Sequence, residues 1–299
     1  MEVNSVMNAG EMRECRSLFR HLVKLRYHKT NQAHFSTGIK DNLKPPWKIL
    51  FFGTDDFAME SLKMLYSEMK SRRLVQELSI ICAQSKSPVS RFGLKHDLKL
   101  INWKPSVNEI LETRADIGLV ASFGHLIPSQ IISAFPLGML NVHASILPRW
   151  RGAAPIVHAV MHRDIVTGVT IMKIRPHNSY VTMFAAPKVG AWMAVCDWAK
   201  MSGEEVYARH RALTHLHPLQ TTWQGKPLRL LECAPAESRD GEPGSLGFDW
   251  QARELVVTCR ERSAVRVRRL KLPGKAAISA VDFFNGYMNK VARSLWRFG

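Results

Sequence analysis

The chain has 299 residues, of which 46% are hydrophobic and 22% charged, a composition that excludes disordered and fibrous proteins and fits one large domain or two ordinary ones. Its 42 Lys and Arg residues outnumber the 25 Asp and Glu residues, and the net charge of +17 indicates a nucleic acid or another anionic partner. No apolar run is long enough for a conventional transmembrane helix, so no membrane partner is expected. The five cysteines form no C-x-x-C pair, which argues against a disulfide framework or a zinc finger.

Residues 1–46 are predicted to form a targeting leader followed by a linker. From Arg16 to Lys40 the segment holds several basic residues and no acidic one, with apolar residues between them at roughly helical spacing. This pattern is typical of mitochondrial transit peptides and predicts import into the mitochondrial matrix, with cleavage between Ser36 and Lys44. A solvated basic arm that contacts RNA is the alternative interpretation.

Folded structure is predicted to begin at Trp47, after the Pro45-Pro46 pair. Lys48–Phe52 is a short, continuously apolar run, which is the pattern of a buried strand, and a turn containing Gly53 separates it from a predicted helix over Phe57–Lys70. A buried strand, a glycine turn and a helix predict the opening of a doubly wound α/β domain.

The following segment continues this alternation up to about residue 183. Ser85–Gly93 is polar and is predicted to be a loop, and Pro155–His162 is predicted to be a helix. Four further apolar runs are predicted strands: Glu77–Ala83, Asp116–Ala121, Gly138–His143 and Thr167–Ile174.

Residues 184–299 have a different pattern, with short apolar runs separated by Gly and Pro turns, and predict a smaller β-rich domain. In one such run, Ala264–Leu270, apolar residues alternate imperfectly with arginines, and one face of the strand is expected to be apolar and the other basic. The tryptophans of this half are predicted to be core or packing residues, and the stacking of RNA bases on a basic surface is the alternative for them. The basic residues expected to contact RNA phosphates there are Arg266, Arg268, Arg269 and Lys271.

The predicted strand Gly138–His143 ends in two polar residues that carry chemistry. Asn141 and His143 are two positions apart, so their side chains project to the same face of the strand. Ligands of open α/β sheets bind at the carboxyl ends of the strands, where this pair lies.

The stretch Asn141–Pro155 reads N-V-H-A-S-I-L-P-R-W-R-G-A-A-P and resembles the signature of the folate-dependent formyltransferases. Thr167–Met172, Phe52–Thr54 and Ala121–Gly124 also fit this family, and the pattern fits best its members that act on initiator methionyl-tRNA. The resemblance implies a doubly wound, mostly parallel, Rossmann-like sheet with a second, smaller β-barrel of the OB-like type. It also implies 10-formyltetrahydrofolate as co-substrate, no metal, and a monomer.

The resemblance implies that the amino group of the acceptor attacks the formyl carbon and forms a tetrahedral oxyanion. Asn141 can donate an amide hydrogen bond to that oxyanion, which is worth roughly 10²–10³ in rate. His143 can manage the proton of the amine, worth roughly 10²–10⁴. The residues that match the folate-binding loop are Ser145, Ile146, Leu147 and Pro148, and Arg149 and Arg151 near this site are expected to contact RNA.

The chain departs from the family after the strand that ends at Ile174. There the family has an Asp-x-Gly turn whose aspartate completes the site, whereas Arg175–Met183 reads R-P-H-N-S-Y-V-T-M. Asp164 precedes the strand and Asp197 follows the gap, so neither matches the catalytic position. We therefore expect the catalytic domain, 47–183, to lack its carboxyl-terminal part. A catalytically inactive or weak chain that only binds folate or tRNA is the alternative.

Two further interpretations remain at this stage. His158 and His162 have the spacing of two metal ligands on a helix, but no third ligand is evident, and helix packing is the preferred interpretation. Formyltransferases that act on a nucleotide sugar or a purine intermediate share the Asn-x-His pair. The basic carboxyl-terminal domain and the leader favour a tRNA substrate over these small molecules.

Overall fold

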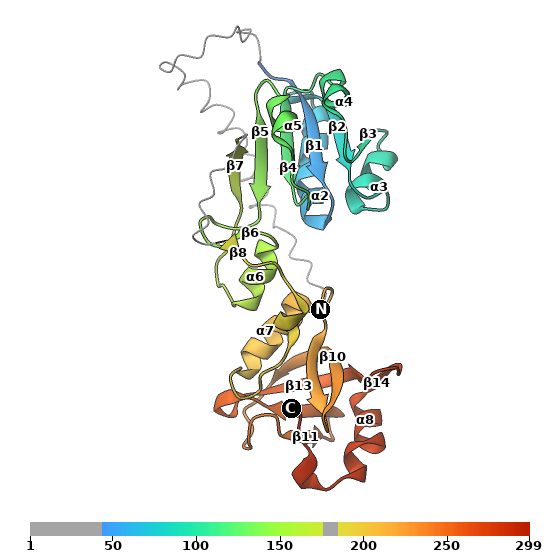
Figure 1. Ribbon diagram of the computed structural model, residues 1–299, viewed down its shortest axis with the longest axis vertical. Helices are drawn as coiled ribbons and strands as arrows, with labels where there is room; N and C mark the ends of the chain where they lie inside the picture. The colour runs from blue at the N-terminus through green and yellow to red at the C-terminus, as the bar shows by residue number, and fades with distance from the viewer. Residues whose placement is uncertain (1–43, 176–184) are drawn as a thin grey trace. The chain divides into compact units, whose positions relative to one another are not determined.

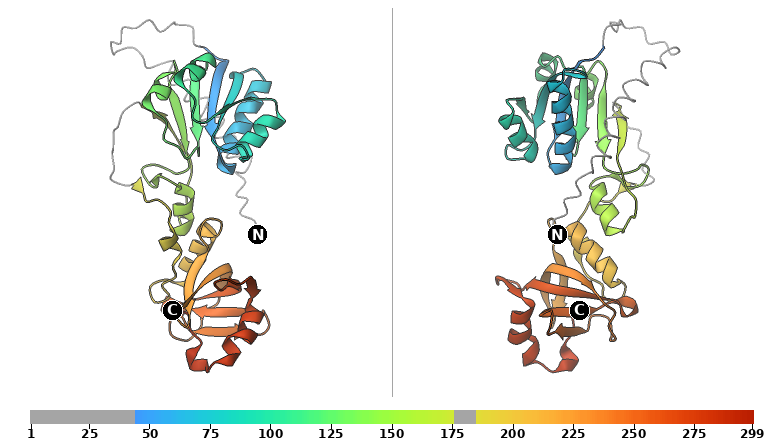
Figure 2. Two further views of the ribbon diagram at one scale, coloured as in Figure 1. Left: turned by 45° about the vertical axis from the view of Figure 1, so that its right-hand side comes forward. Right: turned by 180° about the vertical axis from the view of Figure 1, so that it is seen from behind.

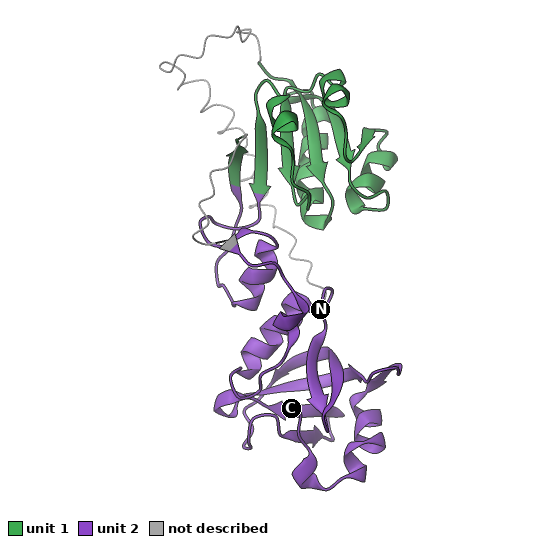
Figure 3. Cartoon of the chain, in the orientation of Figure 1, with its two compact units in different colours: residues 1–142, 171–178 green, residues 143–170, 179–299 purple. Residues whose placement is uncertain are grey.

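The computed structural model describes residues 44–175 and 185–299, which divide into two compact units (Figure 3). The first contains the described residues up to Val142 together with those from Ile171, and the second contains His143–Thr170 and the carboxyl-terminal half. The predicted leader lies almost entirely outside the described residues, as does the predicted domain boundary at residues 183 and 184.

The first unit is built on a six-stranded sheet (Figure 1). Its strand order is β3-β2-β1-β4-β5-β7, and the pairings of β1 with β2 and β4, of β2 with β3, and of β4 with β5 are parallel. The order reverses beside β1, which is the doubly wound arrangement that the sequence predicts. The strands are β1 (Trp47–Gly53), β2 (Val75–Cys82), β3 (Lys99–Asn102), β4 (Ile117–Ala121), β5 (Met139–His143) and β7 (Thr170–Ile174).

The central strand β1 is buried on both faces, which explains its continuous apolar sequence. Ile49 and Phe51 pack on one side with residues of α2 and α3, whereas Leu50 and Phe52 pack on the other side with residues of α4 and α5. Helices therefore cover both faces of the sheet (Figure 2). The helices are α2 (Asp56–Lys70), α3 (Pro88–Lys95), α4 (Val107–Glu112) and α5 (Ser129–Ser133).

The loop predicted over Ser85–Gly93 is wrong, because α3 occupies most of it. Ser87 is the N-cap and its hydroxyl accepts the backbone N–H of Ser90 at 3.0 Å, while Pro88 occupies the first turn. A serine followed by a proline at this position is a helix-start signal. The polar composition of the segment concealed it.

The second unit contains an antiparallel sheet in the order β11-β12-β13-β10-β9, with β14 paired to β13. Trp296–Gly299 hydrogen-bonds to both ends of this order: Phe298 bridges to Trp223 on β9, and Arg297 bridges to Ser245 beside β11. This contact closes the sheet into the predicted small barrel. The strands are β9 (Leu219–Trp223), β10 (Lys226–Ala236), β11 (Leu246–Asp249), β12 (Glu254–Thr258), β13 (Ala264–Lys271) and β14 (Ala277–Ser279).

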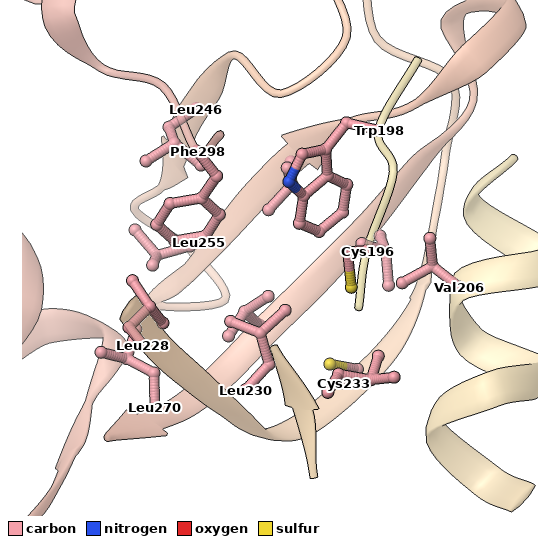
Figure 4. Packing of buried hydrophobic residues seen from close by; sticks show 14 of the residues in the cluster. Cys196, Trp198, Val206, Leu228, Leu230, Cys233, Leu246, Leu255, Leu270 and Phe298 are labelled. Atoms are coloured by element: carbon pink, nitrogen blue, oxygen red, sulfur yellow. The ribbon is translucent and has the colours of Figure 1, made fainter. Parts of the chain in front are cut away.

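Side chains from these strands meet inside the barrel, where Phe298 lies close to Leu255 and Trp198 (Figure 4). Trp198 and Trp223 are core residues, whereas Trp192 and Trp250 are 68% and 69% exposed and are not. Trp250 is a packing residue, because its ring contacts those of Phe248 and Phe284 at 4.7 and 5.0 Å. The remaining elements are the short strands β6 (Arg151–Gly152) and β8 (Ala185–Ala186), α6 (Pro155–Met161), α7 (Gly203–Leu213), α8 (Ala280–Gly286), and the 3-10 helices η1 (Ala191–Ala194), η2 (Arg260–Arg262), η3 (Met288–Lys290) and η4 (Arg293–Leu295).

Helix α7 joins α6 to the barrel within the second unit. Its first turn is capped reciprocally by Ser202 and Glu205. A Cβ at Gly203 would lie 2.2 Å from the carbonyl oxygen of Ala264, so only glycine allows this turn to lie against β13. Helix α6 packs on α7, and its Val157 and Met161 contact the barrel core. This packing explains why residues 143–170 belong to the same compact unit as the barrel.

Candidate active site

Strand β5 carries both residues of the predicted catalytic pair at its carboxyl end. Asn141 pairs in register with Val120 of β4, and His143 is the last residue of the strand. Both residues are partly buried, so strand β5 holds their backbone in place while their side chains remain accessible to solvent. The structure therefore places the two residues as the sequence predicts.

A carbonyl group contacts the His143 ring. The Nε2 atom of His143 lies 3.0 Å from the backbone oxygen of Trp150, seven positions along the chain. Within the intervening segment, the hydroxyl of Ser145 donates to the backbone oxygen of Arg149 at 2.8 Å, and this hydrogen bond holds the turn of the segment. The loop that follows β5 is thus closed on itself by short-range hydrogen bonds.

The loop predicted to bind folate is anchored by Thr170. The hydroxyl of Thr170 donates to the backbone oxygen of Ser145 at 2.7 Å and accepts the N–H of Leu147 at 3.1 Å. Ser145 is buried, so its side chain shapes the loop, whereas Ile146 is 52% exposed and Pro148 is exposed. Of the four predicted residues, Ile146 and Pro148 offer the most surface to a ligand.

The Trp150 indole is surrounded by polar and aromatic side chains, which we call the Trp150 cage: Arg149, His158, His162 and Asp164. Its indole Nε1 donates to Asp164 at 2.6 Å, and the Arg149 guanidinium lies 4.4 Å from the ring centroid. The His158 ring stacks on it at 5.2 Å, and the His162 ring lies at 4.5 Å. His158 is buried, and its Nε2 donates to the carbonyl of Pro187 at 2.8 Å. Both histidines therefore pack, as the preferred interpretation predicts.

Asp164 is the charged centre of this cage. It accepts from Arg149 Nε at 2.8 Å and from Arg149 Nη2 at 2.5 Å, a bidentate pair. The hydrogen bond from Arg149 lowers the pKa of Asp164, and Trp150 lowers it further. The same contact raises the pKa of Arg149. Sequence reasoning assigned no role to Asp164 or Trp150, because their contacts depend on the folded loop.

Polar and aromatic groups also gather at the carboxyl ends of β1 and β4 in the first unit. Asp55 caps α2 by accepting the N–H of Ala58 at 3.1 Å and also accepts from Ser122. The ring of Phe123 contacts those of Trp103 and His125 at 4.9 and 5.2 Å. Sequence reasoning noted Ala121–Gly124 only as a family match and missed this aromatic cluster.

The predicted RNA-binding arginines of β13 lie on the barrel surface, but each has an acidic partner. Arg268 contacts Glu254, Arg266 lies 3.9 Å from the same carboxylate, and Arg269 pairs with Glu232 at 3.0 Å. Lys271 is exposed and forms no ion pair with any residue in 44–175 or 185–299. Arg151 is likewise exposed and unpaired within these residues.

Among residues 44–175 and 185–299, no three His, Cys, Asp or Glu side chains gather in a way that could hold a metal ion. No helix among these residues is long and apolar enough to cross a membrane. The position where the family has its Asp-x-Gly turn falls in residues 176–184, outside the described residues.

The formyl transferase family model matches residues 98–177, and the model of the formyl transferase C-terminal domain matches residues 190–288. The chain is 32% identical to the mitochondrial methionyl-tRNA formyltransferase of Homo sapiens, over 82% of this chain and 79% of that protein. The chain belongs to the methionyl-tRNA formyltransferase family. The bacterial methionyl-tRNA formyltransferase of Methylobacillus flagellatus is 28% identical over 80% of this chain and 96% of that protein.

A solved structure with the same fold is HypX from Aquifex aeolicus in complex with tetrahydrofolic acid. It superposes with a TM-score of 0.50 at 15% identity, over 83% of this chain and 48% of that one. WlaRD, a sugar 3N-formyl transferase, superposes with a TM-score of 0.51 at 12% identity, over 78% of this chain and 100% of that one. The fold is therefore that of formyltransferases.

The comparison with the human relative also bears on the predicted gap. The alignment extends over 314 positions, whereas 82% of 299 residues is only about 245, so about 69 positions have no residue in this chain. This agrees with a chain that lacks several tens of residues present in its relative.

Proposed function

We propose that this chain transfers the formyl group of 10-formyltetrahydrofolate to the α-amino group of methionyl-tRNA. The observation that carries the proposal is the placement of Asn141 and His143 together at the end of β5, in a chain of this family. Asn141 donates an amide hydrogen bond to the oxyanion that forms on the formyl carbon. His143 accepts the proton that the attacking amine releases and returns it to the departing nitrogen of tetrahydrofolate.

The folate co-substrate fits the surfaces that the structure offers. The exposed Ile146 and Pro148 provide apolar contact area in the loop that follows His143. The folate supplies the formyl carbon, and these residues hold and orient it.

The test is formylation of methionyl-tRNA by the purified chain and by two variants. Asn141→Ala should lower kcat by roughly 10²–10³ and His143→Gln by roughly 10²–10⁴. Asn108→Ala, an exposed asparagine on α4, is the matched control and should leave kcat unchanged. Full activity in either site variant would place the chemistry elsewhere.

For tRNA we propose a phosphate-binding surface centred on Arg229 and Lys271. These residues face each other in register across β10 and β13, both exposed, and neither forms an ion pair within the described ranges. Like charges placed directly opposite destabilise a sheet, so an external anion is the natural partner of this pair. Arg266, Arg268 and Arg269 are proposed to contact phosphates beside it, although Glu254 and Glu232 already neutralise part of their charge. Arg149 and Arg151 are proposed to contact RNA near the site.

The proposal predicts the salt dependence of tRNA binding. Each phosphate contact contributes roughly 0.7–0.9 to the log–log slope, so replacing Arg229 and Lys271 together with Ala should reduce the slope by about 1.5. Lys200→Ala is the control, because Lys200 is exposed but already paired with Asp197 at 3.0 Å. An unchanged slope in the double variant would move the RNA surface elsewhere.

We further propose that the chain acts as a monomer in the mitochondrial matrix after removal of residues 1–46 or a part of them. The support is the acid-free, basic stretch Arg16–Lys40 and the mitochondrial origin of similar proteins. Amino-terminal sequencing and light scattering of the protein from mitochondria test both statements. A mature protein that still begins at Met1, or a stable dimer, would contradict them.

A further inference from the structure

The contact between His143 and Trp150 fixes where the proton sits on the His143 ring. The backbone oxygen of Trp150 can only accept a hydrogen bond, and Nε2 of His143 lies 3.0 Å from it. Nε2 therefore carries the hydrogen in the neutral ring, and the lone pair is on Nδ1. A base that takes a proton from an amine needs such a free lone pair.

The carbonyl that accepts the hydrogen bond from His143 belongs to Trp150, whose backbone conformation is unusual. Trp150 has a φ of 54°, in the left-handed region that residues other than glycine rarely adopt. The conformation persists because the indole is held on several sides, by Asp164, Arg149, His158 and His162.

Asp164 is the group on which this cage depends. Its side chain is only 9% exposed and accepts three charge-assisted or short hydrogen bonds, two from Arg149 and one from Trp150. No other side chain of the described residues forms a hydrogen bond with the Trp150 indole. Loss of the carboxylate would release the indole and, with it, the orientation of the Trp150 carbonyl.

We propose that Asp164 is a positioning residue for formyl transfer: by holding Arg149 and Trp150, it keeps the Trp150 carbonyl on Nε2 of His143, so that His143 presents Nδ1 as the base. This inference rests on the proposed function. The Trp150 carbonyl thereby performs the task that an aspartate performs beside the histidine of serine proteases, which is to fix the tautomer of the ring. A neutral carbonyl stabilises the protonated ring less than a carboxylate does.

The first test is the tautomer of His143 in the full chain, measured by ¹⁵N NMR of histidine-labelled protein. His143→Gln identifies its resonance among those of the 12 histidines. The unsubstituted chain should show protonated Nε2 and unprotonated Nδ1. Protonated Nδ1 would overturn the proposal without any variant being made.

The second test compares Asp164→Asn and Asp164→Ala. Asn retains one oxygen acceptor for Trp150 but loses the bidentate pair with Arg149, whereas Ala loses both. We expect His143 to become a mixture of tautomers and kcat to fall roughly ten- to hundredfold in the Ala variant, with a smaller change in Asn and little change in KM. Asp197→Asn, which removes an exposed carboxylate of the same unit, should change neither quantity.

The outcomes separate the two proposals. Unchanged tautomer and kcat in Asp164→Ala overturn the positioning role, and so does a fall in kcat with the tautomer unchanged, because that indicates a merely structural effect. If the tautomer shifts as expected but the unsubstituted chain transfers no formyl group, the proposed function fails and the role of Asp164 in placing His143 stands.

Discussion

Replacing Arg268 with Ala should destabilise the barrel far more than the solvent exposure of the Arg268 side chain suggests. Arg268 lies on β13 beside Glu254 of β12, because the register places Leu255 opposite Val267 and so brings the next residues of the two strands together. The Glu254 side chain is only 9% exposed, whereas that of Arg268 is 56% exposed. The variant would therefore leave a buried carboxylate without its main partner.

The magnitude follows from these surroundings. Removing one partner of a fully buried ion pair costs about 3–5 kcal/mol, and an exposed pair is worth about 1 kcal/mol or less. Arg268 is half exposed and Arg266 remains 3.9 Å from Glu254, so we expect a loss of about 2 kcal/mol in the free energy of unfolding. With a denaturant slope of about 2 kcal/mol per molar, the urea midpoint should fall by roughly 1 M.

Urea unfolding followed by tryptophan fluorescence measures this change, and the neighbouring residue provides the control. Arg269 pairs with Glu232 at 3.0 Å, but both side chains are about half exposed, so Arg269→Ala should cost about 0.5 kcal/mol or less. In a Glu254→Gln background, Arg268→Ala should cost much less than it does alone. Equal midpoints for the two arginine variants would refute this account of Glu254.

Three further outcomes are expected. Inserting a family-like Asp-x-Gly segment after Arg175 should raise kcat for formylation, and the same insert with Ala for Asp should not; equal rates would make that aspartate dispensable. Because Arg149 lowers the pKa of Asp164, the ionised carboxylate stabilises the fold above its ordinary pKa of about 3.9, and this stabilisation is lost as the pH falls through the lowered pKa. The free energy of unfolding of Asp164→Asn should therefore depend less on pH in the acid range. Burial raises the pKa of Cys196 and Cys259 to about 12, so a thiol reagent at pH 8 should label them only on unfolding.

Much of the first unit could be predicted because its signals are local. The continuous apolar run of β1 follows from burial on both faces, and the spacing of Asn141 and His143 follows from the period of a strand. Helix α3 was missed because polar residues dominate its sequence, although Ser87 and Pro88 mark its start.

The contacts around Trp150 could not be read from the sequence in the same way. Asp164 lies 14 residues from Trp150, and it was set aside because it does not occupy the position of the family's aspartate. Its role depends on the return of the loop from β5, which brings Arg149 and Trp150 to the same carboxylate. Likewise the apolar character of Trp192 and Trp250 is compatible with a core position, but the structure leaves both side chains exposed.

The closure of the barrel by Trp296–Gly299 has a consequence for how the second unit folds. The hydroxyl of Thr221 donates to the backbone oxygen of Gly299 across 78 residues, and Arg297 reaches Glu242 across 55. Contacts between such distant parts of the chain form late and slowly, because the loop-closure entropy must be overcome before they stabilise the sheet. Until this segment docks, β11 is an open edge with unpaired backbone groups, and β9 is covered only at Gln220, which pairs with Val195 and Cys196. Aggregation during refolding should therefore begin at these two strands.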